Sequence, residues 1–94
     1  MVSELLTPVR STQFKRDVAR ARRRGKDLAK LRALLTALVR QHPLPARYRD
    51  HALRGPWTGY RDVHLEPDWI LIYRVREGKL YLARTGTHAD LFRE

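Results

Sequence analysis

The side chains best suited to chemistry are histidines and acids in the C-terminal half of the chain. His51, His64 and His88 lie there, with Asp62 and Asp68 close to them in sequence. Histidine has an ordinary pKa of about 6.5, so its imidazole can take up or release a proton near neutral pH. Such a set can supply the general base and the general acid of a proton-transfer mechanism.

RNA is a substrate that this set could cleave without a metal ion. RNA carries its own nucleophile, the 2′-hydroxyl. An enzyme must therefore supply a base for that hydroxyl, an acid for the departing 5′-oxygen and cations for the phosphoryl oxygens. Arginine fits the last role because its planar guanidinium binds phosphate through two hydrogen bonds. Four aromatic residues could stack on unpaired bases: Tyr48, Trp57, Trp69 and Phe92.

A metal ion is the main alternative explanation for the histidines and acids. Four residues have side chains of the type that binds zinc: His51, His64, Asp68 and His88. Their spacings match no metal-binding motif, and the chain contains no cysteine, which excludes thiolate metal sites, disulfides and a cysteine nucleophile. We therefore expect neither a metal nor another cofactor.

Several of these residues also have an ordinary structural explanation. A single histidine in a basic protein is usually solvated or hydrogen-bonded, and this is our interpretation of His42, beside Pro43 at a helix end. Trp57 and Trp69 are more often core residues than stacking platforms. The run from Arg22 to Arg24 is equally compatible with a solvated helix face.

The charge of the chain favours a nucleic-acid partner. The 94 residues include 20 Lys and Arg against 10 Asp and Glu, a formal net charge of +10 at pH 7. Nucleic-acid phosphate is the first partner this charge suggests, followed by an acidic protein and an anionic membrane surface. Nine of the basic residues lie between Arg10 and Lys30, far in sequence from the histidines.

The N-terminal sequence predicts a cytoplasmic protein. The stretch MVSELLTPVRSTQF has Glu4 where a signal peptide has a basic residue, and it lacks an apolar run of the required length. No later segment approaches the roughly 18 consecutive apolar residues of a membrane-spanning helix.

The elements that must position the candidate residues follow from hydrophobic periodicity. Residues 1–9 contain a short apolar stretch that fits an edge strand. Ser11 caps a basic amphipathic helix that ends at Gly25, and Asp27 caps a second helix that stops before Pro43. Joined by so short a connection, the two helices form a hairpin.

The second half of the chain predicts a loop followed by strands. Residues 42–59 are rich in proline and glycine and read as a long irregular loop, which is usually functional. Residues 60–65, 69–76 and 79–85 alternate with the period of strands and form an antiparallel three-stranded meander. The middle strand has apolar residues on both faces, so we expect it to be central.

Together these elements predict an α+β fold. With 43% hydrophobic residues, residues 1–94 can form one core and therefore a single domain. The helical hairpin packs on one face of a small twisted antiparallel sheet, and a short turn or helix ends the chain. Alternation puts Tyr60, Asp62 and His64 on the face opposite Val63 and Leu65. If Val63 and Leu65 face the helices, the titratable residues of this strand lie on an open face of the sheet that is free to bind a partner.

The amino-acid sequence also resembles that of a known family. The order YRDHALRGPWTGYRDVHLEPDWILIYRV, followed by LARTGTHADLF, is similar to the YafQ-type toxins of the RelE/ParE superfamily. These are bacterial endoribonucleases of type II toxin–antitoxin systems. The helical stretch FKRDVARARRRGKDLAKL is similar too, so the resemblance covers roughly residues 11–92. Ala52 departs from the family, which commonly has proline there.

The resemblance implies a RelE-like fold and cleavage of mRNA in the ribosomal A site. It implies four catalytic residues, which are His51, His64, Asp68 and His88. It implies three substrate-binding residues, which are Trp69 and Phe92 for bases and Arg84 for the scissile phosphate. In this scheme His88 is the general acid, His51 or His64 is the base, and Asp68 orients a histidine or the 2′-hydroxyl.

The resemblance also implies partners. A cognate acidic antitoxin would hold the protein inactive, and the basic helices would contact that antitoxin or the ribosomal RNA around the mRNA. Two other functions remain open: a ParE-like toxin that poisons DNA gyrase, and a basic RNA-binding module without catalysis. The histidine set argues against the gyrase poison, which would not need it.

Overall fold

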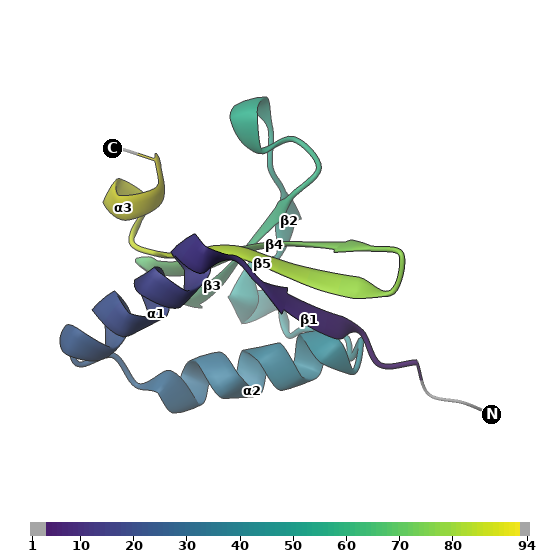
Figure 1. The fold of residues 1–94 in the computed structure, drawn as a ribbon, viewed down its shortest axis with the longest axis horizontal. Helices are drawn as coiled ribbons and strands as arrows, with labels where there is room; N and C mark the ends of the chain where they lie inside the picture. The colour runs from purple at the N-terminus through teal and green to yellow at the C-terminus, as the bar shows by residue number, and fades with distance from the viewer. Residues whose placement is uncertain (1–3, 93–94) are drawn as a thin grey trace.

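The computed structural model describes residues 4–92, and two helices lie together on one side of a sheet (Figure 1). Helix α1 spans Thr12–Arg23 and α2 spans Leu28–Val39. The side chain of Ser11 accepts a hydrogen bond from the backbone N–H of Phe14, and Asp27 accepts one from Ala29, so both predicted caps are confirmed.

The sheet has five strands in the order β1-β5-β4-β3-β2. The predicted meander is confirmed as β3 (Arg61–Glu66), β4 (Trp69–Arg76) and β5 (Lys79–Gly86), which pair antiparallel with β4 in the centre. The predicted N-terminal edge strand is confirmed as β1 (Thr7–Arg10), although residues 1–3 of its range lie outside the described part. Because β1 pairs parallel with β5, the sheet is mixed and not purely antiparallel as expected.

The loop predicted for residues 42–59 contains regular structure. It holds the 3-10 turns η1 (Ala46–Tyr48) and η2 (Gly55–Trp57), and between them the strand β2 (His51–Ala52). Strand β2 pairs antiparallel with β3, so that His51 lies opposite Asp62. A two-residue strand is too short to produce a recognisable alternation, which is why its sequence reads as loop.

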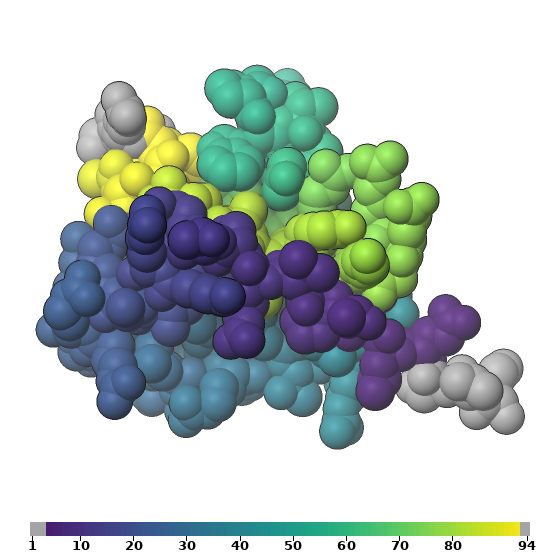
Figure 2. Space-filling view, in the orientation of Figure 1, coloured from purple at the N-terminus to yellow at the C-terminus, as the bar shows by residue number. Residues whose placement is uncertain are grey.

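Both faces of the sheet are covered, so the expectation of an open second face is wrong. The helices cover one face, over a core that includes Phe14, Leu34 and Leu71. On the other face Ile70 and Ile72 are fully buried beneath residues of the η2 segment and of helix α3 (His88–Phe92). Figure 2 shows the η2 segment (teal-green) standing above the sheet, between α3 (yellow) and the β4–β5 hairpin (light green).

A buried carboxylate fastens α1 to β5. The Asp17 side chain is fully buried, and its two oxygens accept hydrogen bonds from Arg84 Nε at 2.7 Å and Arg84 Nη2 at 3.1 Å. They also accept from the backbone N–H of Thr85 at 3.1 Å and from Arg20 Nη2 at 3.1 Å. A buried charge with this many donors is satisfied, and it fixes the helix against the strand.

A second carboxylate holds α3 in place. Asp90 Oδ2 accepts a hydrogen bond from the backbone N–H of Thr87, while Thr87 Oγ1 accepts one from the N–H of Asp90. Arg24, the C-cap residue of α1, donates a hydrogen bond to the same carboxylate at 2.7 Å, and this hydrogen bond holds the pKa of Asp90 well below its usual range. Gly86 lies so close that a Cβ there would be 2.8 Å from Asp90 Oδ2.

Replacing the buried carboxylate should destabilise the protein. The substitution Asp17→Asn leaves Arg84 as an uncompensated cation, and we expect a loss of about 3 kcal/mol of unfolding free energy. Urea denaturation at neutral pH measures this loss. Asp27→Asn is the matched control, because asparagine caps an exposed helix equally well and should change stability by less than about 0.5 kcal/mol. Equal effects of the two substitutions would contradict the anchoring role of Asp17.

The Asp90 interactions should make stability depend on acid pH. The folded-state pKa of Asp90 lies below its unfolded value of about 3.9. These interactions therefore stabilise the protein above that pH, and the stabilisation is lost as the pH falls toward the folded-state pKa. We expect Asp90→Asn to flatten the fall in unfolding free energy below about pH 4, as measured by urea denaturation across that range. The exposed Glu77→Gln should leave the curve unchanged, and an equally steep curve for Asp90→Asn would refute the prediction.

Candidate active site

Strand β2 brings His51 to the carboxylate of Asp62. The Nδ1 atom of His51 lies 3.3 Å from Asp62 Oδ1 and 2.7 Å from the carbonyl oxygen of Arg49. The His51 side chain is 54% exposed, whereas that of Asp62 is 5% exposed. The carboxylate therefore lies beneath an accessible imidazole.

His64 lies near the same carboxylate oxygen. It lies two residues after Asp62 on β3, and its Nδ1 atom is 3.7 Å from Asp62 Oδ1. Within residues 4–92, neither of these two buried atoms has a hydrogen-bond partner. The sequence placed Asp62 on the same strand face as His64, but Asp62 was not among the expected catalytic residues. Its position two residues before His64 in an alternating strand is the signal that could have identified it.

The segment that leads into β2 is held by ion pairing and burial. Asp50 accepts a hydrogen bond from Arg61 Nε at 3.0 Å and another from the hydroxyl of Tyr73 at 2.8 Å. Burial and the Asp50 carboxylate raise the pKa of Tyr73, so this hydroxyl keeps its proton and remains a donor. His51 therefore follows a residue whose side chain is fixed to two strands.

His88 and Asp68 form a hydrogen-bonded pair. His88 is the first residue of α3, and its Nδ1 atom lies 2.6 Å from Oδ1 of Asp68, in the β3–β4 turn. The backbone N–H of His88 donates to the same oxygen at 2.8 Å, and these hydrogen bonds lower the pKa of the Asp68 carboxyl. An ionised Asp68 accepts a proton-bearing Nδ1, so Nε2 of His88 is the ring nitrogen left for other chemistry.

The three histidines and Phe92 form one continuous row, which we call the histidine row. Ring centroids are 6.3 Å apart between His51 and His64 and 5.6 Å apart between His64 and His88. Phe92 follows, 6.2 Å from His88. The row joins side chains from β2, β3 and α3. Together with Asp68, it contains five of the seven site residues that the sequence suggested.

Trp69 does not belong to this row. Its side chain is 1% exposed, in the core beneath the helices, and its indole N–H donates to Thr85 Oγ1 at 3.0 Å. No ring face is left for a nucleotide base. The expected stacking role of Trp69 is therefore wrong, and the ordinary explanation of a core tryptophan is confirmed.

Arg84 is already paired in this structure. Its guanidinium donates two hydrogen bonds to Asp17, which raise the pKa of Arg84, and its side chain is 22% exposed. A phosphate would have to compete with this buried carboxylate. In the structure Arg84 therefore fixes α1 to β5 through Asp17, whereas the sequence suggested a cation free to bind phosphate.

The described part of the chain has neither a cluster of metal ligands nor a membrane-spanning helix. Among residues 4–92, no group of three or more histidine, cysteine or acidic side chains has an arrangement that could hold a metal ion. In the same part of the chain, no helix is long and apolar enough to cross a membrane.

Comparison with known proteins relates this site to a family. The family model described as "Bacterial toxin of type II toxin-antitoxin system, YafQ" matches residues 6–93. The mRNA interferase toxin YafQ of Escherichia coli K12 is 54% identical over 83 residues, which cover 87% of this chain and 90% of that protein.

Solved structures agree with this relationship. The crystal structure of YafQ from E. coli BL21(DE3) superposes with a TM-score of 0.89 at 50% identity, covering 93% of this chain and 98% of that one. The toxin in the crystal structure of the E. coli DinJ–YafQ toxin–antitoxin complex gives a TM-score of 0.86 at 50% identity, covering 94% and 98%. These matches confirm the RelE-like α+β fold. The chain therefore belongs to the YafQ family of bacterial type II toxin–antitoxin toxins.

Proposed function

We propose that this protein is an endoribonuclease toxin that cleaves mRNA in the ribosomal A site by acid–base catalysis without a metal. The observation that carries the proposal is the histidine row, in which Asp68 holds His88 by Nδ1 and leaves Nε2 available. Family membership supports the same activity, because a relative that is 54% identical is named an mRNA interferase.

The reaction needs two proton transfers at one phosphate. A base removes the proton of the 2′-hydroxyl, whose oxygen attacks phosphorus, while an acid protonates the 5′-oxygen as its bond to phosphorus breaks. The products are a 2′,3′-cyclic phosphate and a 5′-hydroxyl. His64 and His88, with ring centroids 5.6 Å apart, are close enough to contact a single phosphodiester.

The environments of the histidines suggest their roles. We assign His88 as the general acid, since Asp68 fixes its ring so that Nε2 carries the proton to be donated. His51 or His64 is the base, and Asp62 lies where it would stabilise either ring once protonated. Phe92, beside His88, is half-buried and can stack on a base adjoining the scissile phosphate.

The partners follow from charge and from the relatives. On α1, four basic side chains are exposed: Lys15, Arg16, Arg22 and Arg23. This surface suits ribosomal RNA and a cognate acidic antitoxin. The E. coli relative has been crystallised as a DinJ–YafQ toxin–antitoxin complex. Because translated mRNA and ribosomes are its targets, we place the protein in the cytoplasm.

Removal of the proposed acid should abolish cleavage without unfolding the protein. We expect His88→Ala to reduce the cleavage rate by about 10²–10⁴-fold, the usual contribution of one proton-transfer group. Primer extension on a translated message measures cleavage, while circular dichroism and antitoxin binding report folding. His42→Ala is the matched control, because His42 is exposed at the end of α2 and should leave cleavage intact.

The same variants separate the other candidate functions. Full cleavage by His88→Ala would remove His88 from the mechanism. If the triple alanine variant of His51, His64 and His88 still arrested growth, catalysis by the row would be refuted. A gyrase poison or a non-catalytic RNA-binding protein would then explain the toxicity.

The nucleophile and the metal requirement can be tested on the substrate. A 2′-deoxy substitution at the nucleotide just 5′ of the cleaved bond removes the attacking hydroxyl and should stop cleavage at that bond. The same substitution two nucleotides away is the control and should be harmless. EDTA, added at a concentration that leaves the ribosome intact, should not change the rate. Cleavage of the deoxy substrate would exclude the 2′-hydroxyl as nucleophile, and cleavage lost on chelation would revive the zinc site.

A further inference from the structure

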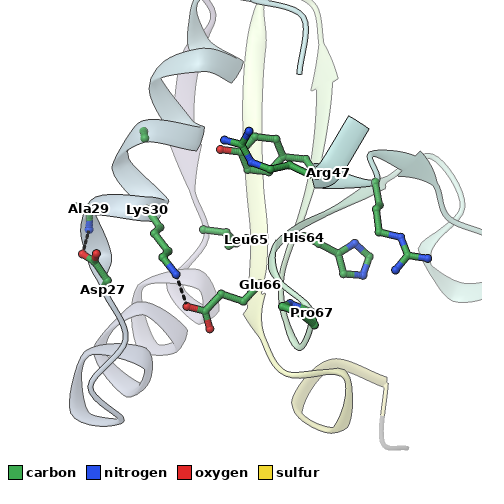
Figure 3. Close-up of a pocket in the computed structure, with 11 residues that line it drawn as sticks. Asp27, Ala29, Lys30, Arg47, His64, Leu65, Glu66 and Pro67 are labelled. Carbon is green, nitrogen blue, oxygen red and sulfur yellow. Dashed lines mark hydrogen bonds and ion pairs between the residues drawn. The ribbon is translucent and has the colours of Figure 1, made fainter. Parts of the chain in front are cut away.

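A groove opens directly beside the histidine row. It has a volume of about 740 Å³ and lies between α2, η1 and the end of β3. Figure 3 shows Lys30 on one side of the groove and His64 on the other, with Leu65 and Glu66 between them and Arg47 at the far end. His64 is therefore shared between the candidate active site and the groove.

The acids of the groove are already engaged. Glu66 accepts hydrogen bonds from Lys26 and Lys30, both at 2.8 Å, and the Lys26 bond above all lowers the pKa of its carboxyl. Asp27 accepts the N-terminal N–H of Ala29 as the cap of α2. The charge of Glu66 is therefore paired with two lysines, and Asp27 is hydrogen-bonded as a helix cap.

The cations of η1 are differently placed. Arg47 and Arg49 line the groove and are exposed. The Arg47 guanidinium lies over the ring of Tyr48, 4.9 Å from its centroid. A guanidinium resting on an aromatic ring gives a flat cationic surface that can stack on a base or bind a phosphate.

We propose that this groove binds the stretch of substrate RNA that adjoins the scissile phosphate. The inference rests on the proposed endoribonuclease activity and extends it. A phosphodiester chain held at His64 must continue past that side chain, and the groove is the hollow that His64 itself lines. Exposed arginines beside an aromatic ring are the combination that single-stranded nucleic-acid grooves use. Phosphates lie on Arg47 and Arg49, and a base lies against the Arg47–Tyr48 pair.

The test removes the two charges in a protein that cannot cut its ligand. The double variant Arg47→Gln/Arg49→Gln is made in the His88→Ala background. Its affinity for a short single-stranded RNA is measured by fluorescence anisotropy at several salt concentrations. Loss of two phosphate contacts should weaken binding about tenfold or more and reduce the slope of log affinity against log salt by about 1.4. Arg47→Lys/Arg49→Lys keeps both charges and should restore the slope.

A charge-matched control separates the groove from the overall charge. Arg32→Gln/Arg40→Gln removes two exposed cations on a different side of α2, where they line a separate apolar hollow. This control should bind the RNA like the parent. In the catalytically active background, the groove variant should raise KM for programmed ribosomes more than it lowers kcat.

The outcomes distinguish this inference from the proposed function. Equal effects of the groove variant and the control would refute the groove as an RNA site. RNA binding unchanged but antitoxin binding weakened would assign the groove to the protein partner and overturn the inference. Growth arrest by the triple alanine variant of His51, His64 and His88 would refute the catalytic proposal. Unaltered RNA binding by the groove variant would refute only the groove.

Discussion

The fold depends on one buried negative charge. Asp17 carries a carboxylate into the interface between α1 and β5, where two arginines and a backbone N–H surround it. Arg20 then lies between Asp17, at 3.1 Å, and Asp90 of α3, at 3.5 Å. Through Arg20, the ion pairs that hold α1 on the sheet are connected to those that hold α3, the helix that carries His88.

This arrangement changes the meaning of the basic N-terminal half. Of the nine basic residues between Arg10 and Lys30, four form ion pairs with acids within residues 4–92: Arg20, Arg24, Lys26 and Lys30. Their charges fix the C-terminal end of α1 to α3, and the α1–α2 connection and the start of α2 to the end of β3. The excess charge thus has two functions, since part of it assembles the domain and the exposed remainder is available to an anionic partner.

Elements with a long, regular pattern were predictable, whereas contacts between distant segments were not. The caps at Ser11 and Asp27 and the alternation of β4 follow from local rules, so their prediction was confirmed. Strand β2 consists of two residues and exists only because β3 pairs with it. The cover of the second sheet face likewise depends on where η2 and α3 fold back.

In the candidate site, too, residue types were predictable from the sequence, whereas contacts between residues far apart in the sequence were not. Residue type and motif identified the histidines, and alternation placed Asp62 beside His64. Sequence allowed Trp69 to be either a core residue or a stacking platform. It could not show on which face of the sheet the ring lies, because a strand buried on both sides gives its apolar residues no preferred face. Nor could it show that Arg84 meets Asp17, because 67 residues separate them.

The short length of α3 has a consequence for motion at the site. A helix of five residues is far below the length at which helices persist alone in water. It is held by the Asp90 contacts and by the burial of Leu91, whereas β4 is paired on both sides and buried on both faces. Local opening therefore costs less free energy at α3 than at β4. His88 accordingly lies on the element of the site that we expect to open more readily, whereas His64 lies on β3, which is paired with the central strand β4.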